Sequence, residues 1–376
     1  MKIALVGPFY PYRGGISSFN RMLYRSLVKE NSLLVVNFSR LYPGIVFPGR
    51  TQYEEHIRSS EDISIRLIDS INPLTWYQAA KVIVDFDPEV LIFHHWHVFF
   101  AFQYGIILRF VKKKRKSCKT IVICHNIFPH ERMPFGNSIL KYFFRVSDGF
   151  ILLAGKLEKD LRNLIKEPLC RVSPHPLYSQ FGSKINKQKA RERLGIKEKR
   201  VVLYFGLVRK YKGIEHLIKA VDKVLEKFDV RFLIVGEFYV KKKEYLELVN
   251  SIRRFHKVTI VDRYIPDEEI STYFSAADVV VLPYVSATQS GIVKIAYHFE
   301  VPCIVTNVGG LKEDVKDGET GFVVEPGSEL SLAEAIVKYF KDDCERKFRE
   351  NIKATKSKYS WERFVSDLME LYRELK

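Results

Sequence analysis

Two cations separated by two residues are the groups in this sequence most suited to chemistry on an anionic substrate. The segment FGLVRKYKGIEHLIKAV (205–221) places Arg209 and Lys212 after an apolar run, just before a helix that we expect to start near Gly213. Cations at such a position can neutralise a departing diphosphate, above all where no metal is bound. A solvated basic turn is the alternative interpretation.

A second candidate is the polar loop that opens SATQSGIVKIAYHFE (286–300). It follows the apolar run DVVVLP (278–283) and leads into a helix expected to begin near Gly291. Backbone amides at a helix start have no intrahelical acceptor, and they favour an anion. We therefore predict phosphate binding by the loop and first helical turn, which comprise Ser290, Gly291, Ile292 and Val293.

A third candidate is the glycine pair Gly14 and Gly15 in GPFYPYRGGISSF, between the first apolar run and an expected helix. Glycine permits close approach of a ligand, and the helix start offers free amides. The spacing is not G-x-G-x-x-G, so a nicotinamide dinucleotide site is not indicated. Glycines that serve the turn alone are the alternative.

Histidines follow two further apolar runs. His94, His95 and His97 lie in FHHWHVFF, and His125 comes directly after TIVIC. We predict that His95 and His97 contact an acceptor substrate. A structural role for these histidines is the second interpretation. Zinc binding is the least favoured one, because neighbouring side chains on an extended strand end point to opposite faces. The triplet DFD (85–87) matches a D-x-D metal motif, but it precedes a strand and is expected at the wrong end of the sheet.

Short apolar runs alternate with amphipathic segments along the chain, a pattern that predicts parallel sheets covered by helices on both faces. Strands are expected at 2–7, 33–38, 90–95, 120–125, 149–154, 200–206, 231–236, 258–262, 278–283, 302–306 and 320–325. The aperiodic stretch 173–189 is the expected linker, and an amphipathic helix is expected over 360–376. Such sheets bind ligands at the carboxyl ends of their strands, where the candidate loops lie.

Composition narrows the class of protein. A length of 376 residues with 47% hydrophobic residues suits two domains, and the scattered cysteines indicate neither disulfides nor a Cys-rich zinc site. Neither a signal peptide nor a membrane-spanning helix is expected. The net charge of +17 favours anionic partners, and the run KKKRK (112–116) can lie on anionic lipid or form a solvated face. A nucleic-acid partner is not expected, since no recognition module accompanies the charge.

Taken together, these motifs resemble the retaining glycosyltransferases of family 4, and the resemblance covers essentially the whole chain. The GG pair at 14–15, TIVICH, FGLVRKYKG, SAADVVVLP and PCIVTNVGGLKEDVKDGETGFVVEP (302–326) carry it. The resemblance implies an α/β fold of the GT-B type, with two facing Rossmann-like, doubly wound domains. The expected divisions are an acceptor-binding domain over 1–175, a nucleotide-sugar-binding domain over 190–358, and a helix over 359–376 that crosses back to the first domain.

Site residues follow from the resemblance by position. It implies that Gly15 lies near the donor phosphates, that His125 orients the donor sugar, and that Lys212 matches the family lysine. Position 207 is Leu where the family has arginine, and Arg209 is expected to substitute. The segment 262–265, which includes Tyr264, is expected to hold the nucleobase.

The largest departure from the family lies in the 286–300 segment. The family carries two glutamates eight positions apart, where this chain has Thr288 and Ala296. Thr288 and Gln289 can still hydrogen-bond a sugar hydroxyl, whereas Ala296 cannot hold a ribose. Glu300, one helical turn further on, is a possible substitute.

The resemblance implies a hexosyltransferase-type enzyme that moves sugar from a UDP- or GDP-linked donor to a lipid-linked or polysaccharide acceptor. Retention of configuration, no cofactor and no metal are expected. A cytoplasmic location is expected too, with peripheral contact at the inner membrane face through the basic N-terminal domain. The alternatives are a catalytically inactive sugar-nucleotide-binding or scaffold protein, favoured by the missing glutamates, and a sugar-nucleotide epimerase.

Overall fold

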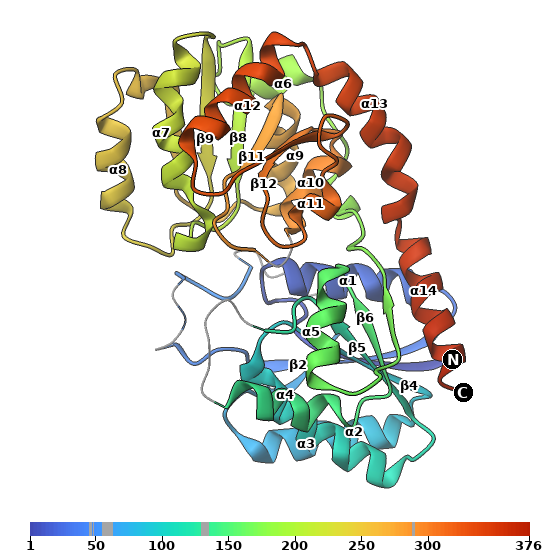
Figure 1. Cartoon of the computed structure of the whole chain (residues 1–376). Coiled ribbons are helices and arrows are strands. Elements are labelled where there is room, and N and C mark those ends of the chain that lie inside the picture. The colour runs from blue at the N-terminus through green and yellow to red at the C-terminus, as the bar shows by residue number, and fades with distance from the viewer. Residues whose placement is uncertain (45–46, 48, 55–62, 129–134, 288–289) are drawn as a thin grey trace. The chain divides into compact units, whose positions relative to one another are not determined.

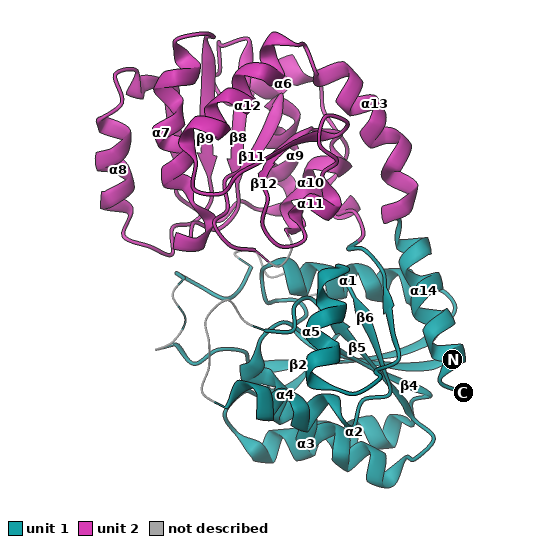
Figure 2. Ribbon diagram, viewed as in Figure 1, with its two compact units in different colours: residues 1–175, 360–376 teal, residues 176–359 magenta. Residues whose placement is uncertain are grey.

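The computed structural model describes residues 1–44, 47, 49–54, 63–128, 135–287 and 290–376, and it divides into two compact units (Figure 2). Unit 1 comprises residues 1–175 and 360–376, and unit 2 comprises residues 176–359. Each unit is a parallel sheet covered by helices (Figure 1). The predicted α/β class is confirmed.

Unit 1 contains a seven-stranded sheet of order β3-β2-β1-β4-β5-β6-β7. Its strands are β1 (Lys2–Val6), β2 (Ser32–Arg40), β3 (Ile65–Asp69), β4 (Val90–His95), β5 (Lys119–Cys124), β6 (Gly149–Leu152) and β7 (Cys170–Val172). Its helices are α1 (Gly15–Leu27), α2 (Pro73–Phe86), α3 (Val98–Lys114), α4 (Gly136–Phe144), α5 (Lys156–Leu164) and α14 (Trp361–Glu374). The strand order reverses between β1 and β4, so their carboxyl ends form a switch point for ligand binding.

The central strands of unit 1 bury alternate side chains on opposite faces of the sheet, as a period of two requires. Ala4, Val6 and Phe93 belong to a core that also contains residues of α2, α3, α4 and α5. Leu5 and Ile92 belong to a second core, which α1 and α14 complete. Both faces of the unit 1 sheet are therefore buried in hydrophobic cores, which explains the continuous apolar runs in the sequence.

The last helix, α14, is fixed to unit 1 by polar as well as apolar contacts. Its Asp367 carboxylate accepts a buried hydrogen bond from the Ser173 hydroxyl at 2.8 Å, and Glu370 pairs with Arg171 at 2.6 Å. Gly149 of β6 leaves room for the helix, because a Cβ there would meet Leu371 and Leu375 at 3.2–3.3 Å. Residues nearly two hundred positions apart thus share one core.

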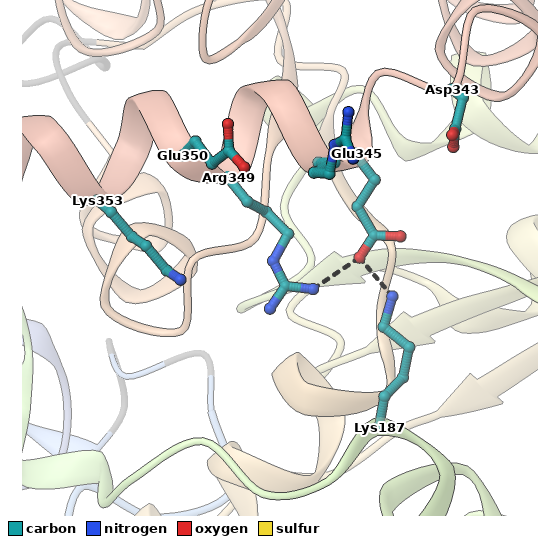
Figure 3. A pocket seen from close by; sticks show the side chains of 7 residues that line it. Lys187, Asp343, Glu345, Arg349, Glu350 and Lys353 are labelled. Carbon is teal, nitrogen blue, oxygen red and sulfur yellow. Dashed lines mark hydrogen bonds and ion pairs between the residues drawn. The ribbon is translucent and has the colours of Figure 1, made fainter.

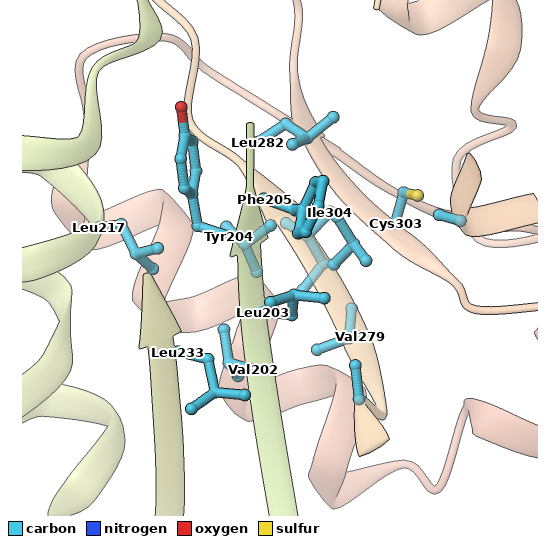
Figure 4. Packing of buried hydrophobic residues seen from close by; sticks show 14 of the residues in the cluster. Val202, Leu203, Tyr204, Phe205, Leu217, Leu233, Val279, Leu282, Cys303 and Ile304 are labelled. Carbon is cyan, nitrogen blue, oxygen red and sulfur yellow. The ribbon is translucent and has the colours of Figure 1, made fainter. Parts of the chain in front are cut away.

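Unit 2 contains a six-stranded sheet of order β10-β9-β8-β11-β12-β13. Its strands are β8 (Arg200–Phe205), β9 (Val230–Val235), β10 (Val258–Val261), β11 (Val279–Leu282), β12 (Cys303–Thr306) and β13 (Gly321–Val324). Its helices are α6 (Lys187–Arg193), α7 (Ile214–Leu225), α8 (Lys242–Asn250), α9 (Asp267–Ala276), α10 (Gly291–His298), α11 (Leu311–Asp314), α12 (Glu329–Lys341) and α13 (Glu345–Thr355). Figure 4 shows the apolar side chains of its central strands packed together, Leu203 and Val279 among them.

All eleven predicted strands are present, with bounds that differ by at most two residues. The prediction missed β3 and β7, which lie at the two edges of the unit 1 sheet. The predicted helix over 360–376 is present as α14, and the triplet 85–87 ends α2 ahead of β4, at the amino end of that strand.

Candidate functional site

Two loops of unit 2 meet where its strand order reverses. Strands β8 and β11 are neighbours, and the segments 206–213 and 283–290 follow their carboxyl ends. Ligands of doubly wound sheets bind at such a switch point. The topology therefore brings the two donor-site candidates of the sequence to the same edge of the sheet.

Lys212 belongs to the loop after β8, and its side chain contacts the loop after β11. Its ammonium donates a hydrogen bond to the Tyr284 hydroxyl at 2.8 Å and lies 4.5 Å from the centre of the tyrosine ring. Burial lowers the pKa of Lys212; Tyr211 opposes this shift, and the charge of Arg209 adds to it. Burial raises the pKa of the Tyr284 hydroxyl, which is therefore protonated and can itself donate onward. The Ser290 hydroxyl lies 3.3 Å from it.

Arg209 is on the same loop but has different neighbours. Its guanidinium carbon lies 5.0 Å from the centre of the Tyr239 ring. The backbone holds both residues in place, since the Tyr239 amide donates to the Val208 carbonyl at 2.9 Å. The loop that carries Arg209 is thus joined to the loop that follows β9, and the aromatic face orients the cation.

Glycine is required where the two donor-site loops approach. Gly213 has φ +60°, and a Cβ there would lie 2.2 Å from the Pro283 carbonyl oxygen. The amide of Val285 also donates to the Tyr211 carbonyl at 2.9 Å. These contacts fix the backbone on which Lys212 and Tyr284 stand.

The start of α10 offers fewer free amides than the sequence suggests. Ser290 caps the helix, with its hydroxyl accepting from the Ile292 amide at 3.3 Å, and the Val293 amide donates to the Ser290 carbonyl at 3.3 Å. The Gly291 amide has no acceptor among the described residues. Thr288 and Gln289 lie outside the described residues. Of the amides predicted to hold a phosphate, that of Gly291 is therefore the best placed.

The position of the family's second glutamate is a core position in this chain. Ala296 is fully buried within the hydrophobic core of unit 2. The Glu300 carboxylate pairs with Lys356 at 3.0 Å and with Lys353 at 3.7 Å. These cations follow or belong to α13, so the pairing argues against the suggested substitution by Glu300, which stays a prediction.

Tyr264 follows β10, a strand at the edge of the unit 2 sheet. Its side chain is half-buried. Strands β9 and β10 pair in parallel, so the loop that carries Tyr264 leaves the same sheet edge as the loop that carries Tyr239. The nucleobase contact predicted for this segment stays a prediction.

In unit 1, Gly14 and Gly15 stand where β1 leads into α1. Gly14 has φ +110°, a conformation that favours glycine, and nothing lies within 4 Å of a Cβ placed there. No side chain caps α1, and its first turn contains no acidic residue. No carboxylate in the first turn would repel an anion there, and phosphate binding at Gly14 and Gly15 stays a prediction.

His125 lies in a group of buried aromatic rings at the carboxyl edge of the unit 1 sheet. Its Nε2 is 3.2 Å from Nδ1 of His94, and Phe19 of α1 makes edge contacts with His94, His125 and His175. Burial lowers the pKa of His125 well below its usual range, and the neighbouring histidines act in the same direction. His125 is therefore neutral at physiological pH.

The two predicted acceptor histidines occupy different environments. His95 is fully buried, with Nε2 at 3.2 Å from the Ile127 carbonyl, so its ring is inaccessible to an acceptor in this structure. His97 is half-buried and caps α3 by accepting from the Phe99 amide at 3.2 Å. Direct acceptor contact stays a prediction for His97, and the burial of His95 argues against it there.

Neither a metal site nor a spanning helix appears in the part of the chain that the structure describes. No group of three His, Cys, Asp or Glu side chains is arranged to hold a metal ion there. None of its helices is both long and apolar enough to cross a bilayer.

A charged pocket of about 420 Å³ lies beside α13 (Figure 3). Three of its charged side chains, Lys187, Glu345 and Arg349, pair with one another. Glu345 accepts from both Lys187 and Arg349, and Lys187 also pairs with Asp278 at 2.7 Å. Asp278 immediately precedes β11, so the pocket is associated with the amino end of that strand, opposite the edge that carries Lys212. We assign this pocket a structural role.

Sequence reasoning missed Tyr239 and Tyr284. Tyr284 directly follows the run DVVVLP, and that position after a strand was a usable signal for it. Tyr239 lies three residues beyond Gly236, whose φ of +147° lets the loop after β9 approach Gly206. Both side chains contact the predicted cations, so they belong to the candidate site.

Comparison with solved structures identifies the class of fold. Structures of GT-B glycosyltransferases match the whole chain, so the fold is GT-B. Sucrose-phosphate synthase from Thermosynechococcus elongatus matches with a TM-score of 0.77 and 21% identity, covering 100% of this chain and 98% of that one. The Anabaena protein HepE, in complex with UDP, matches with a TM-score of 0.75 and 16% identity, covering 100% and 99% of the two chains.

Sequence comparison adds a more particular similarity. Residues 199–342, which include β8 through α12, match the family described as Glycosyl transferases group 1. D-inositol 3-phosphate glycosyltransferase of Corynebacterium diphtheriae is 31% identical over 172 residues, or 44% of this chain and 40% of that protein. An uncharacterized glycosyltransferase of Methanocaldococcus jannaschii is 24% identical over 386 residues, covering 100% and 99%. The first three relatives are matched over 40%, 47% and 52% of their length, about half.

Proposed function

We propose that this protein is a GT-B glycosyltransferase that transfers a sugar from a nucleotide-sugar donor. The observation that carries the proposal is the pair of cations, Arg209 and Lys212, at the switch point of unit 2, with Lys212 held on Tyr284. A leaving diphosphate accumulates negative charge as the sugar departs. Two oriented cations and the Gly291 amide can stabilise that charge without any reorganisation during the reaction.

The finer assignments also belong to this proposal. We assign the chain to family 4, with a retaining mechanism that needs no metal, and we place the donor phosphates at Ser290–Val293. His125 orients the donor sugar. The UDP complex of HepE, a fold relative, favours a uridine donor over a guanosine donor. The acceptor is a lipid-linked or polysaccharide glycan, and the protein acts at the cytoplasmic face of a membrane.

The test compares two lysines of the same loop. Lys212→Ala removes the ammonium bonded to Tyr284, whereas Lys210→Ala removes an exposed cation two residues away. Full-length protein is incubated with UDP- and GDP-sugars, and release of nucleoside diphosphate is measured with and without a lipid-linked glycan. We expect Lys212→Ala to lower the rate about 10- to 100-fold, because a hydrogen bond to a charged group is lost, and Lys210→Ala to leave it within about twofold, because surface changes are usually mild.

The absence of both family glutamates favours one other candidate, an inactive protein that only binds sugar nucleotides. Such a protein shows a thermal shift with a nucleotide-sugar but releases no diphosphate in any mixture. An epimerase instead interconverts donor sugars without an acceptor. If Lys212→Ala and Lys210→Ala reduced transfer equally, the charge-neutralising role of Lys212 would be wrong.

A further inference from the structure

Helix α3 of unit 1 carries large apolar side chains on its outward side as well as on its inward side, with basic residues from Arg109 onward. Phe100, Tyr104 and Ile107 are buried against the sheet, as a helix of this layer requires. On the outward side, however, Phe102 is 47% exposed, and Phe110 is half-buried. Large apolar side chains exposed together often mark a surface that binds protein or lipid. None of the described residues covers Phe102 fully.

Exposed and half-buried apolar side chains of three neighbouring helices contact one another in pairs. Tyr77 of α2 and Phe110 of α3 have ring centres 4.7 Å apart, and Phe102 lies 5.6 Å from the ring of Tyr142 in α4. Leu74, at the start of α2, is 74% exposed. Figure 1 shows α2, α3 and α4 on the same face of the unit 1 sheet. We call this surface, formed by Leu74, Tyr77, Phe102, Phe110 and Tyr142, the aromatic face.

Cations lie on and beside the aromatic face. The Arg109 guanidinium carbon is 3.5 Å from the centre of the Tyr142 ring. The exposed residues Lys81, Lys113 and Lys114 have no carboxylate within ion-pair distance in the described part of the chain. Helices α3 and α4 contain no acidic residue, and α2 contains Asp85 alone.

The neighbouring basic residues show that this excess of positive charge is local. Lys112 pairs with Asp148, and Arg115 pairs with Asp87 at 3.2 Å. The basic run at 112–116 therefore contains residues of two kinds. Lys112 and Arg115 form ion pairs within unit 1, whereas Lys113 and Lys114 remain available to an anionic partner.

We propose that the aromatic face and its lysines dock on an anionic lipid bilayer. Tyrosine and phenylalanine favour the boundary between headgroups and acyl chains, and lysines beside them are attracted to anionic headgroups. The rings contact each other rather than forming a groove, which suits a broad lipid surface. The inference deepens the membrane location given under the proposed function, and it rests on that function only for its biological meaning.

The experiment measures vesicle binding by the full-length protein. Large unilamellar vesicles of phosphatidylcholine, with or without 30% phosphatidylglycerol, are sedimented with protein at low and high salt. We expect binding to the phosphatidylglycerol vesicles, weakened by salt. Lys113→Gln with Lys114→Gln should weaken it about fivefold for each lysine removed, as the attraction of a single basic residue near an anionic surface implies. Leu74→Gln with Tyr77→Gln should also weaken it at high salt, where the apolar contribution dominates.

Matched control variants come from exposed positions of unit 2. Lys219→Gln with Lys227→Gln removes the same charge, and Leu246→Gln with Leu330→Gln removes exposed leucines, which are 39% and 51% exposed in this structure. Both controls should bind vesicles like the unaltered chain. Equal binding to the two vesicle types, or equal loss in test and control variants, would overturn the proposal.

Other outcomes also decide the matter. If Leu74→Gln with Tyr77→Gln abolished a concentration-dependent dimer but left vesicle binding intact, the face would be a contact between copies of this chain and the proposal would fail. Far-UV circular dichroism shows whether each variant is folded. Failure of the glycosyltransferase proposal looks different, because nucleotide-sugar turnover is then absent while vesicle binding remains.

Discussion

Mild acid should destabilise unit 1, because unit 1 buries neutral histidines. His94 and His95 are fully buried, and burial lowers the pKa of His94 to about 3 and that of His95 to about 4. The unfolded chain binds a proton at each residue near pH 6.5. Since the folded pKa is the lower one, both groups favour the folded state above pH 6.5, and this stability is lost as the pH falls towards the folded pKa.

The size of the effect follows from proton linkage. At pH 5.5, one unit below the unfolded pKa, each histidine costs about 1.4 kcal/mol of folding free energy. Burial also lowers the pKa of His125 in the same unit well below its usual range, so the three buried histidines together cost about 4 kcal/mol. That is a large share of the roughly 5–15 kcal/mol that stabilises a typical domain. Glu198 of unit 2 has a pKa lowered to about 2, so its own contribution declines only below the usual pKa of glutamate. The interval from pH 7.5 to 5.5 therefore isolates the histidines.

Tryptophan fluorescence makes the measurement specific for unit 1. All three tryptophans of the chain, Trp76, Trp96 and Trp361, belong to that unit. Urea titrations at pH 7.5 and 5.5 should show a loss of about 4 kcal/mol in the unfolding free energy that tryptophan reports.

Variants of one buried and one exposed histidine test the cause. His94→Gln should reduce the pH dependence by about a third, whatever it does to stability at pH 7.5, because it removes one of the three strongly shifted histidines of unit 1. His256→Gln alters an exposed histidine of unit 2 and should leave the dependence unchanged. The reasoning is refuted if the stability of unit 1 is flat over this interval, or if the slope in His94→Gln equals that of the unaltered chain.

Two further predictions concern the loops of unit 2. Tyr284→Phe deletes the hydroxyl that lies 2.8 Å from Lys212, and it should slow donor turnover about tenfold in a diphosphate-release assay while leaving the melting temperature nearly unchanged. An unaltered rate would show that Tyr284 does not position the lysine. Gly213→Ala forces a Cβ to within 2.2 Å of the Pro283 carbonyl and should cost more than about 2 kcal/mol in urea unfolding followed by circular dichroism. Gly327→Ala, with φ +76° and open space around it, should cost about 1 kcal/mol, and equal losses would show that backbone strain alone acts at Gly213.

The central strands were predictable because they are buried on both faces. Strands such as β4 and β8 consist almost wholly of buried apolar residues, which is visible in any window of the sequence. The edge strand β3, with sequence IRLID, has only one fully buried residue, and β7 has three residues and none fully buried. Their pairing depends on the strands beside them, so local sequence does not specify them.

The site was predictable as far as topology determines it. Loops after β8 and β11 had to leave the same edge of the sheet, and those loops contain the predicted cations and helix start. The bond between Lys212 and Tyr284 joins residues 72 positions apart, and only the folded chain shows it. Likewise, alternation along β4 sends His94 and His95 to opposite faces, as expected, but burial of the His95 ring depends on Phe144 of α4.

Under the proposed assignment to family 4, the replacement of two glutamates changes the electrostatics around Lys212. A carboxylate near Lys212 would favour its charged form and would also repel a diphosphate. In this chain the position of the second glutamate is a buried alanine, and Glu300 is neutralised by cations near α13. The Lys212 ammonium instead donates a hydrogen bond to the neutral Tyr284 hydroxyl, and the Arg209 guanidinium lies over the Tyr239 ring. Neither cation is paired with a carboxylate in the described residues, so the proposed stabilisation of a leaving diphosphate does not depend on either glutamate.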